Sequence, residues 1–172
     1  DITGNEVKLN INTSLKNYAT KERKLVIVHQ LLDEWGKMVE KWQVNKLTGK
    51  GDSVTVAQSL RLKKMPARWS VERPYLYTIE TILMENNKVI DRVSTPFGFR
   101  TINWKTPSNQ FLLNDKPVFI NGIAEYEHLL GQSHAFSKDQ IYSRISWIQS
   151  AGFNAFRDGH QPHNLLYGDL CD

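Results

Sequence analysis

Hydrophobic and polar residues alternate along much of the first hundred positions of the chain. Residues 7–11 alternate strictly, and residues 25–32 form a short, almost continuous apolar run. The apolar residues of segment 54–62 stay in one phase, with Gln58 as the exception. Because side chains point to opposite faces at successive strand positions, this pattern predicts short β-strands that bury one face.

A hairpin is predicted where the alternating segment 75–83 reaches Asn86 and Asn87 and an apolar segment returns at residues 89–93. Asparagine tolerates the positive φ that a tight hairpin turn requires. The two asparagines are therefore expected to form the turn.

Two further segments, residues 37–42 and the stretch around residues 97–99, bring the total to six or seven short strands with no long helix. This arrangement is typical of a two-sheet sandwich of immunoglobulin-like type. The cysteine pair of antibody domains is absent from the sequence, so the strand topology is left open.

After about residue 99 the pattern changes to alternating strands and helices. Residues 116–120 are expected to form a strand, and Ser137 with Gln140 forms a capping box ahead of a helix whose apolar positions share one face. Gly152 is expected to end that helix, and residues 153–157 to form the next strand. A second helix should start near residue 164.

The order β, α, β, α indicates a parallel sheet. Two parallel strands cannot bury both faces, and a closed (β/α)₈ barrel takes about 250 residues. We therefore predict a mainly β protein with an immunoglobulin-like sandwich over residues 1–98. The first β/α units of a truncated barrel follow over residues 99–172, with the boundary near Arg100 and a connection over residues 103–109.

Composition and chain ends narrow this picture. The chain has 172 residues, 40% of them hydrophobic and 23% charged, which is ordinary for a globular protein. It contains no apolar run long enough to span a membrane and no signal-like N-terminus. Cys171 is the single cysteine, so no internal disulfide is expected and the compartment is left open. The chain begins without Met and ends on an apparently helical stretch, which suggests an excised piece of a longer protein.

The net charge of +4 does not indicate nucleic-acid binding. The excess of basic residues lies in the N-terminal half, but these residues are spread singly and no run is longer than Lys63-Lys64. Solvated strand faces explain this distribution better than a nucleic-acid surface.

The densest polar cluster, residues 157–163, follows the second predicted parallel strand, and residues 125–128 follow the first. Ligands of parallel α/β folds bind at the carboxyl ends of the strands, so both clusters are candidates for one rim. Alternatively, His128, His160 and His163 simply fill turns.

Other chemistry is not indicated. A metal site would need a further ligand held in geometry beside His160 and His163, so neither a metal nor a cofactor is expected. The sequence contains no phosphate-binding glycine loop and no nucleophile elbow. Glu125 and Glu127 are two apart at the end of a predicted strand, where the spacing does not fix the positions of both carboxylates. They are therefore not assumed to be a catalytic pair.

Four ordered motifs resemble glycoside hydrolase family 2, the β-galactosidase and β-glucuronidase group. Residues 69–77 resemble its W-S-P-E-x-P-Y-L-Y segment, and residues 97–100 its G-F-R exit from the sandwich. Residues 111–117 resemble its F-x-L-N-G-K-P entry into the barrel. The fourth motif is residues 151–163, similar to A-G-F-N-A-V-R-T-S-H-Y-P-H, together with Tyr167, Leu170, Cys171 and Asp172, which match Y-D-L-C-D.

The resemblance implies a parent glycosidase that hydrolyses O-glycosyl bonds of a carbohydrate with retention, using two glutamates on later barrel strands. Neither of these glutamates is expected within the present chain, which should be inactive alone. The resemblance assigns Arg157 to support of the nucleophile and His160 to contact with sugar hydroxyls.

Two departures from the family pattern concern specificity. Residues 124–127 (Ala-Glu-Tyr-Glu) stand where N-R-H-E is common, and residues 159–162 (Gly-His-Gln-Pro) replace S-H-Y-P. Galactose is therefore not assumed, and an added acid at Glu125 would disfavour a glucuronate carboxylate.

The alternative reading is a non-catalytic carbohydrate- or protein-binding β-sandwich. In it, exposed aromatics such as Trp35 and Trp42 could stack on sugars, although packing in the sandwich core or between domains explains them better. Because an incomplete parallel sheet exposes apolar faces and edges, self-association of the chain is also expected.

Overall fold

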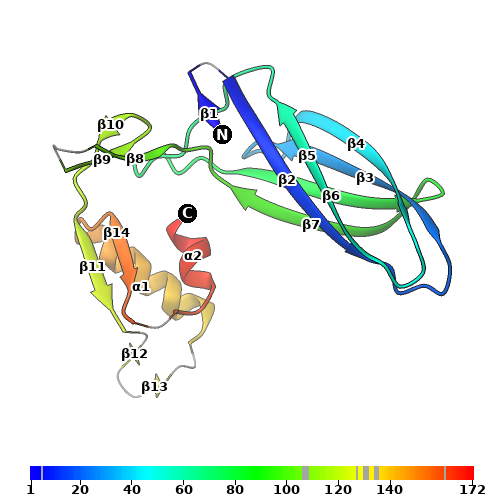
Figure 1. Ribbon diagram of the computed structural model, residues 1–172. Helices are drawn as coiled ribbons and strands as arrows, with labels where there is room; N and C mark the ends of the chain where they lie inside the picture. The colour runs from blue at the N-terminus through cyan, green and yellow to red at the C-terminus, as the bar shows by residue number, and fades with distance from the viewer. Residues whose placement is uncertain (5, 106–108, 127, 130–131, 134–135, 161) are drawn as a thin grey trace. The chain divides into compact units, whose positions relative to one another are not determined.

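The computed structural model describes residues 1–4, 6–105, 109–126, 128–129, 132–133, 136–160 and 162–172. The chain forms two compact units (Figure 1). The first unit comprises Asp1–Trp69 and Tyr75–Arg100, and the second comprises Ser70–Pro74 and Thr101–Asp172.

The first unit is an antiparallel two-sheet sandwich. Its described residues form a three-stranded sheet in the order β1-β2-β5 and a four-stranded sheet in the order β4-β3-β6-β7. Figure 1 shows the long strands β2 and β5 lying across the strands of the larger sheet. The predicted sandwich is thus confirmed. The strands are β1 (Ile2–Thr3), β2 (Glu6–Lys16), β3 (Arg23–Leu32), β4 (Met38–Thr48), β5 (Ser53–Arg61), β6 (Tyr77–Glu85) and β7 (Lys88–Phe97).

The core of the sandwich lies between its two sheets. Val7 of β2 packs in one buried cluster with Leu31 of β3 and with Tyr77 and Ile79 of β6. Alternate residues of β2 and β5 are more exposed, which is the pattern that one buried face produces. Burial of these apolar side chains is the main source of stability for such a sandwich.

The predicted β6–β7 hairpin is confirmed. Asn86 and Asn87 have φ angles of 50° and 61°, and Glu85 pairs with Lys88 across the turn. Two consecutive residues at positive φ give a turn whose twist matches that of the flanking strands.

Two of the family-like motifs meet within the first unit. The Trp69 amide donates a hydrogen bond to the Phe99 carbonyl over 2.9 Å. A Cβ atom at Gly98 would lie 2.7 Å from Trp69 Cβ, and the Arg100 guanidinium lies 4.5 Å from the centroid of the Trp69 ring. The glycine lets the indole approach, and the arginine covers its face.

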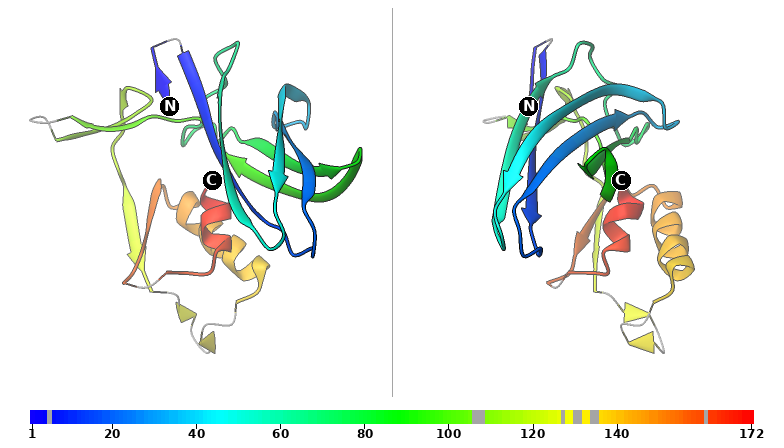
Figure 2. Two further views of the ribbon diagram at one scale, coloured as in Figure 1. Left: turned by 45° about the vertical axis from the view of Figure 1, so that its right-hand side comes forward. Right: turned by 90° about the vertical axis from the view of Figure 1, so that its right-hand side faces the viewer.

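The second unit contains the helices. Its strands are β8 (Ile102–Lys105), β9 (Gln110–Leu113), β10 (Lys116–Pro117), β11 (Gly122–Glu125), β12 (His128–Leu129), β13 (Gln132–Ser133) and β14 (Ala155–Asp158), and its helices are α1 (Lys138–Ser150) and α2 (Leu166–Cys171). β8, β9 and β10 form an antiparallel sheet, and β12 pairs antiparallel with β13. β11 and β14 pair in parallel. Figure 2 shows both helices on the same side of this parallel pair.

The predicted strand over residues 116–120 is wrong in extent and partner. Only Lys116–Pro117 is a strand, and it pairs antiparallel with β9. Asn114 and Asp115 have φ angles of 54° and 66°, so they form a tight turn that directs the chain back along β9. The first parallel strand begins later, at Gly122.

The predicted start and end of the first helix are confirmed. The Ser137 hydroxyl accepts a hydrogen bond from the Gln140 amide, and the Gln140 side chain accepts one from the Ser137 amide. Gly152 has a φ of 86° just after the helix C-cap. Ile141, on the predicted apolar face, is buried. Within the described ranges, neither helix is long and apolar enough to cross a membrane.

A pair of asparagines joins the starting ends of the two parallel strands. The Asn121 amide donates to the Asn154 side chain over 2.8 Å, and the Asn154 amide donates to the Asn121 carbonyl over 2.9 Å. The Asn154 side chain also donates to the Phe119 carbonyl over 2.8 Å. These bonds fix the ends of β11 and β14 relative to each other.

Candidate functional site

The carboxyl ends of β11 and β14 lie side by side. In their parallel register, Ala124 is opposite Arg157 and Glu125 is opposite Asp158. The chain segments that follow the two strands therefore meet at one edge of the sheet, as the sequence predicted for residues 125–128 and 157–163. We call this edge the rim. Glu127 and Gln161 lie outside the described residues, as does the side chain of His128.

Gly159 makes the close approach at the rim possible. Its amide donates to the Glu125 carbonyl over 2.8 Å. A Cβ atom at this position would lie 2.6 Å from that carbonyl oxygen and 2.9 Å from its carbon. Only glycine fits beside the backbone of β11 here.

His160 and Tyr126 form the aromatic part of the rim. His160 has a φ of 58°, and its exposed ring lies 5.5 Å from that of Tyr126 in an edge-on arrangement. The Tyr126 side chain is 51% exposed. A neutral imidazole can both donate to and accept from a hydroxyl group, so the exposed His160 ring can hydrogen-bond in either sense.

Arg157 faces the side of the sheet opposite the helices. The preceding residue, Phe156, stacks on Tyr167 of α2 with ring centroids 5.5 Å apart. Because side chains alternate along a strand, the Arg157 side chain points the other way, and it is exposed. In a closed barrel that side of the strands faces the interior.

The Glu125 carboxylate points to the side of the sheet that carries the helices. It does not point to the opposite side, which we call the open side of the rim. Arg144 of α1 binds it with two hydrogen bonds, from Nε to Oε1 over 2.9 Å and from Nη2 to Oε2. These bonds raise the pKa of the Arg144 guanidinium. This pairing argues against the expectation that Glu125 repels an acidic sugar, which stays a prediction.

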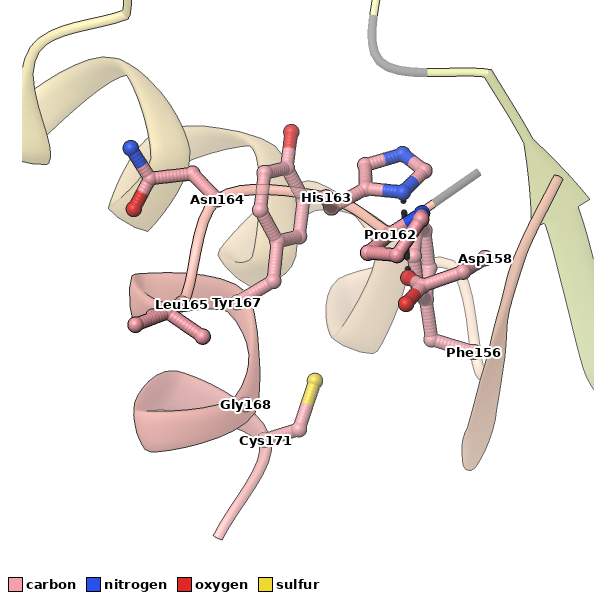
Figure 3. A pocket seen from close by; sticks show the side chains of 9 residues that line it. All are labelled: Phe156, Asp158, Pro162, His163, Asn164, Leu165, Tyr167, Gly168 and Cys171. Carbon is pink, nitrogen blue, oxygen red and sulfur yellow. Dashed lines mark ion pairs between the residues drawn. The ribbon is translucent and has the colours of Figure 1, made fainter. Parts of the chain in front are cut away.

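Asp158 and His163 also lie on the helix side of the sheet. They line a hollow of about 380 Å³ between β14 and α2, together with Tyr167 and Cys171 (Figure 3). His163 Nδ1 lies 3.0 Å from Asp158 Oδ1, at ion-pair distance but without hydrogen-bond geometry. The buried His163 ring packs edge-on against Tyr167 at 4.8 Å and against Phe156 at 5.2 Å.

The predicted polar cluster thus divides. Arg157 lies on the strand face away from the helices and His160 contacts Tyr126, whereas Asp158 and His163 line the hollow beside α2. Partial desolvation and the nearby Asp172 and Asp158 carboxylates raise the pKa of the Cys171 thiol, so this cysteine stays protonated at neutral pH and is a poor nucleophile. Among the described residues, no three His, Cys, Asp or Glu side chains are grouped so that they could hold a metal ion.

Sequence reasoning missed the partners that shape the rim. Arg144 was not singled out, and Tyr126 was noted only as a departure from the family pattern. One signal was present: Arg144 follows the helix cap by seven residues and directly precedes Ile145 on the predicted apolar face. A charge beside that face indicates a partner on the neighbouring strand.

Comparison with known families identifies the class of protein. The model described as "Glycosyl hydrolases family 2" matches residues 1–100. The model described as "Glycosyl hydrolases family 2, TIM barrel domain" matches residues 105–172. The chain belongs to glycosyl hydrolases family 2.

Individual relatives agree with this assignment. The chain is 30% identical over 164 residues to "Beta-galactosidase BoGH2A" of Bacteroides ovatus, a match covering 95% of this chain and 19% of that protein. It is 33% identical over 141 residues to a "Putative beta-glucuronidase" of Formosa agariphila, covering 77% and 14%. A "Beta-galactosidase" of Alteromonas mediterranea is 36% identical over 118 residues, covering 68% and 11%. The chain therefore spans less than a fifth of the length of these proteins.

Solved structures show the same fold. A family 2 glycosyl hydrolase of Bacteroides cellulosilyticus superposes with a TM-score of 0.88 at 25% identity, covering 98% of this chain and 22% of that one. A β-glucuronidase of Bacteroides uniformis superposes with a TM-score of 0.93 at 21% identity, covering all of this chain and 21% of that one. The prediction that the β11–β14 pair and its two helices form the start of a TIM barrel is therefore confirmed.

Proposed function

We propose that this chain is the part of a retaining glycosidase that joins the sandwich to the catalytic barrel. In this proposal residues 1–98 form a supporting module, and residues 99–172 form the opening of a barrel that hydrolyses O-glycosyl bonds of a carbohydrate. The observation that carries the proposal is that Arg157 lies on the strand face away from the helices, with His160 at the same strand end.

Arg157 has the chemistry needed to support a nucleophile. A guanidinium presents fixed donors that orient a carboxylate and keep it ionised. In the proposed enzyme this carboxylate belongs to a glutamate on a later barrel strand. The glutamate attacks the anomeric carbon while a second glutamic acid protonates the leaving oxygen. Water then cleaves the glycosyl-enzyme bond, with the second glutamate acting as base.

His160 is proposed to bind sugar hydroxyls at the rim. The Gly159 amide holds the rim backbone in place, and the Tyr126 ring limits the space beside the imidazole. With Glu125 paired to Arg144, the described part of the rim presents no unpaired carboxylate to the sugar. An acidic sugar such as a glucuronide is therefore compatible with it, as is a galactoside.

Steady-state kinetics of the full-length protein test this proposal. His160→Ala should lower kcat/KM about fivefold, because one hydrogen bond to the sugar is worth about 1 kcal/mol. Tyr142→Ala is the matched control, since Tyr142 is an exposed residue of α1. Equal kcat/KM for wild type and His160→Ala on every substrate that is turned over would exclude His160 from the site.

The alternative, a binding-only sandwich, has less support. Trp42 packs against the core and lies 5.4 Å from the His29 ring, so it cannot serve as an exposed platform. Trp35 is 76% exposed and contacts Tyr75 edge-on. A single exposed indole on a turn offers one stacking face to a sugar. The rim offers both an aromatic ring, Tyr126, and a hydrogen-bonding side chain, His160.

We also propose that the 172-residue chain self-associates. Phe119 is 85% exposed and lines an apolar hollow of about 390 Å³ together with Trp104 and Phe111. Exposed apolar surface of this kind favours association. Light scattering coupled to size exclusion should give a mass above 19.9 kDa that decreases in Phe119→Ser. A monomer over the whole concentration range would contradict this proposal.

A further inference from the structure

A buried imidazole connects the two sheets of the first unit. His29 of β3 is 0% exposed. Its Nδ1 atom lies 3.0 Å from the Thr81 hydroxyl of β6, in its own sheet. Its Nε2 atom lies 2.8 Å from Gln58 Oε1 of β5 and 3.5 Å from the Thr13 hydroxyl of β2, both in the opposite sheet.

These contacts explain the polar exception in segment 54–62. Gln58 occupies a position where the strand pattern calls for an apolar residue, and its side chain points inward to meet His29. A neutral imidazole has one donor and one acceptor. Donation from Nε2–H to Gln58 and acceptance at Nδ1 from the Thr81 hydroxyl satisfy both ring nitrogens.

A protonated imidazole would have no compensating charge in this place. The described residues of β2 and β5 that face the His29 ring are not ionisable. In β3, β4, β6 and β7, the charged or titratable residues on the same face as His29 lie at other positions along the strands. Glu40 is paired with Lys63 at 3.5 Å, and Arg23 is paired with Glu85. The groups on this side are Arg23, Glu40, Lys46, Tyr77, Glu85, Lys88 and Asp91.

We propose that His29 is an acid-sensitive latch between the two sheets, which holds them together when it is neutral and loosens the sandwich when it takes up a proton. Once protonated, the His29 ring must either lose its hydrogen bond to Gln58 in the opposite sheet or carry an unpaired charge in the core. A buried charge without a partner is strongly destabilising.

The direction of the pH effect follows from the burial. Desolvation lowers the pKa of His29, and the hydrogen bond to Gln58 only partly opposes it. In the unfolded chain a histidine has a pKa of about 6.5. The neutral side chain therefore contributes its full stability above pH 6.5. That contribution is lost as the pH falls from there towards the lower folded-state value.

Urea unfolding of the full 172-residue chain between pH 8 and pH 5 tests the latch. Below about pH 6.5 the folding constant of the wild type should fall by up to tenfold per pH unit more steeply than that of His29→Gln, because one proton is taken up on unfolding. Gln43→Ala, at an exposed residue of β4, is the control and should keep the wild-type slope. Equal slopes for wild type and His29→Gln would overturn the proposal.

A second measurement needs no variant. In NMR spectra of the wild-type chain, the His29 ring resonances should stay in the neutral form down to the pH at which the sandwich unfolds. A His29 ring that becomes protonated near pH 6.5 in the folded sandwich would overturn the proposal even if His29→Gln failed to fold. Both outcomes are independent of glycosidase activity.

Discussion

Gly159 sets the spacing between the ends of β11 and β14. Its amide bonds to the Glu125 carbonyl, and no side-chain atom fits between the two backbones. Gly159 stands where the family segment S-H-Y-P has serine. Sequence comparison alone therefore shows only a substitution. The structure gives the physical reason, which is a backbone contact too short for any Cβ atom.

Gly159→Ala should destabilise the second unit by about 1–3 kcal/mol, because the new methyl group must displace the backbone of β11. Urea unfolding of the 172-residue chain measures this change. Gly168→Ala is the matched control: no atom lies within 4 Å of its added Cβ, and alanine favours the helix by about 0.5–1 kcal/mol. Equal stability of Gly159→Ala and wild type would show that the strand ends can separate freely.

At the level of elements, the sequence pattern predicted local structure well where the signal was local. The capping box at Ser137 and the paired asparagines at residues 86–87 are confirmed, because each depends on neighbouring residues. The first parallel strand was placed too early, because Asn114 and Asp115 were not recognised as a turn. The face of the sheet to which each rim side chain points could then not be predicted, because the alternation of side chains depends on where the strand begins.

The Arg157 and His160 positions came from strand order and from the family resemblance together. Their separation from Asp158 and His163 could not be predicted, because it depends on packing of Phe156 against Tyr167 across β14 and α2. Nor could the inward position of His29 be connected with Gln58, since these residues lie on strands of different sheets.

The Glu125–Arg144 pair connects β11 to α1, and its loss should affect stability more than specificity. Glu125→Gln should destabilise the fold by about 1–2 kcal/mol, because Arg144 keeps a partly buried charge with a weaker partner. In the full-length protein, the ratio of kcat/KM for a glucuronide to that for a galactoside should stay within twofold of wild type. A large rise in that ratio would mean that the Glu125 charge does reach the sugar.

At the scale of the whole molecule, the proposed division of labour places the reacting glutamates beyond this chain. The chain matches both family 2 models yet spans less than a fifth of the curated relatives described above. In this account the sandwich supports the barrel, and the barrel opening supplies Arg157 and His160 to the sugar-binding side. The purified 172-residue chain should therefore hydrolyse no glycoside.

Covalent trapping in the full-length protein tests this account most directly. A slow retaining substrate should add the mass of one glycosyl group, and peptide mapping should place it on a glutamate outside residues 1–172. Arg157→Ala should slow the labelling at least tenfold, because the nucleophile loses its charge-assisted hydrogen bonds. A glycosyl group attached within residues 1–172, or turnover by the purified chain, would contradict the account.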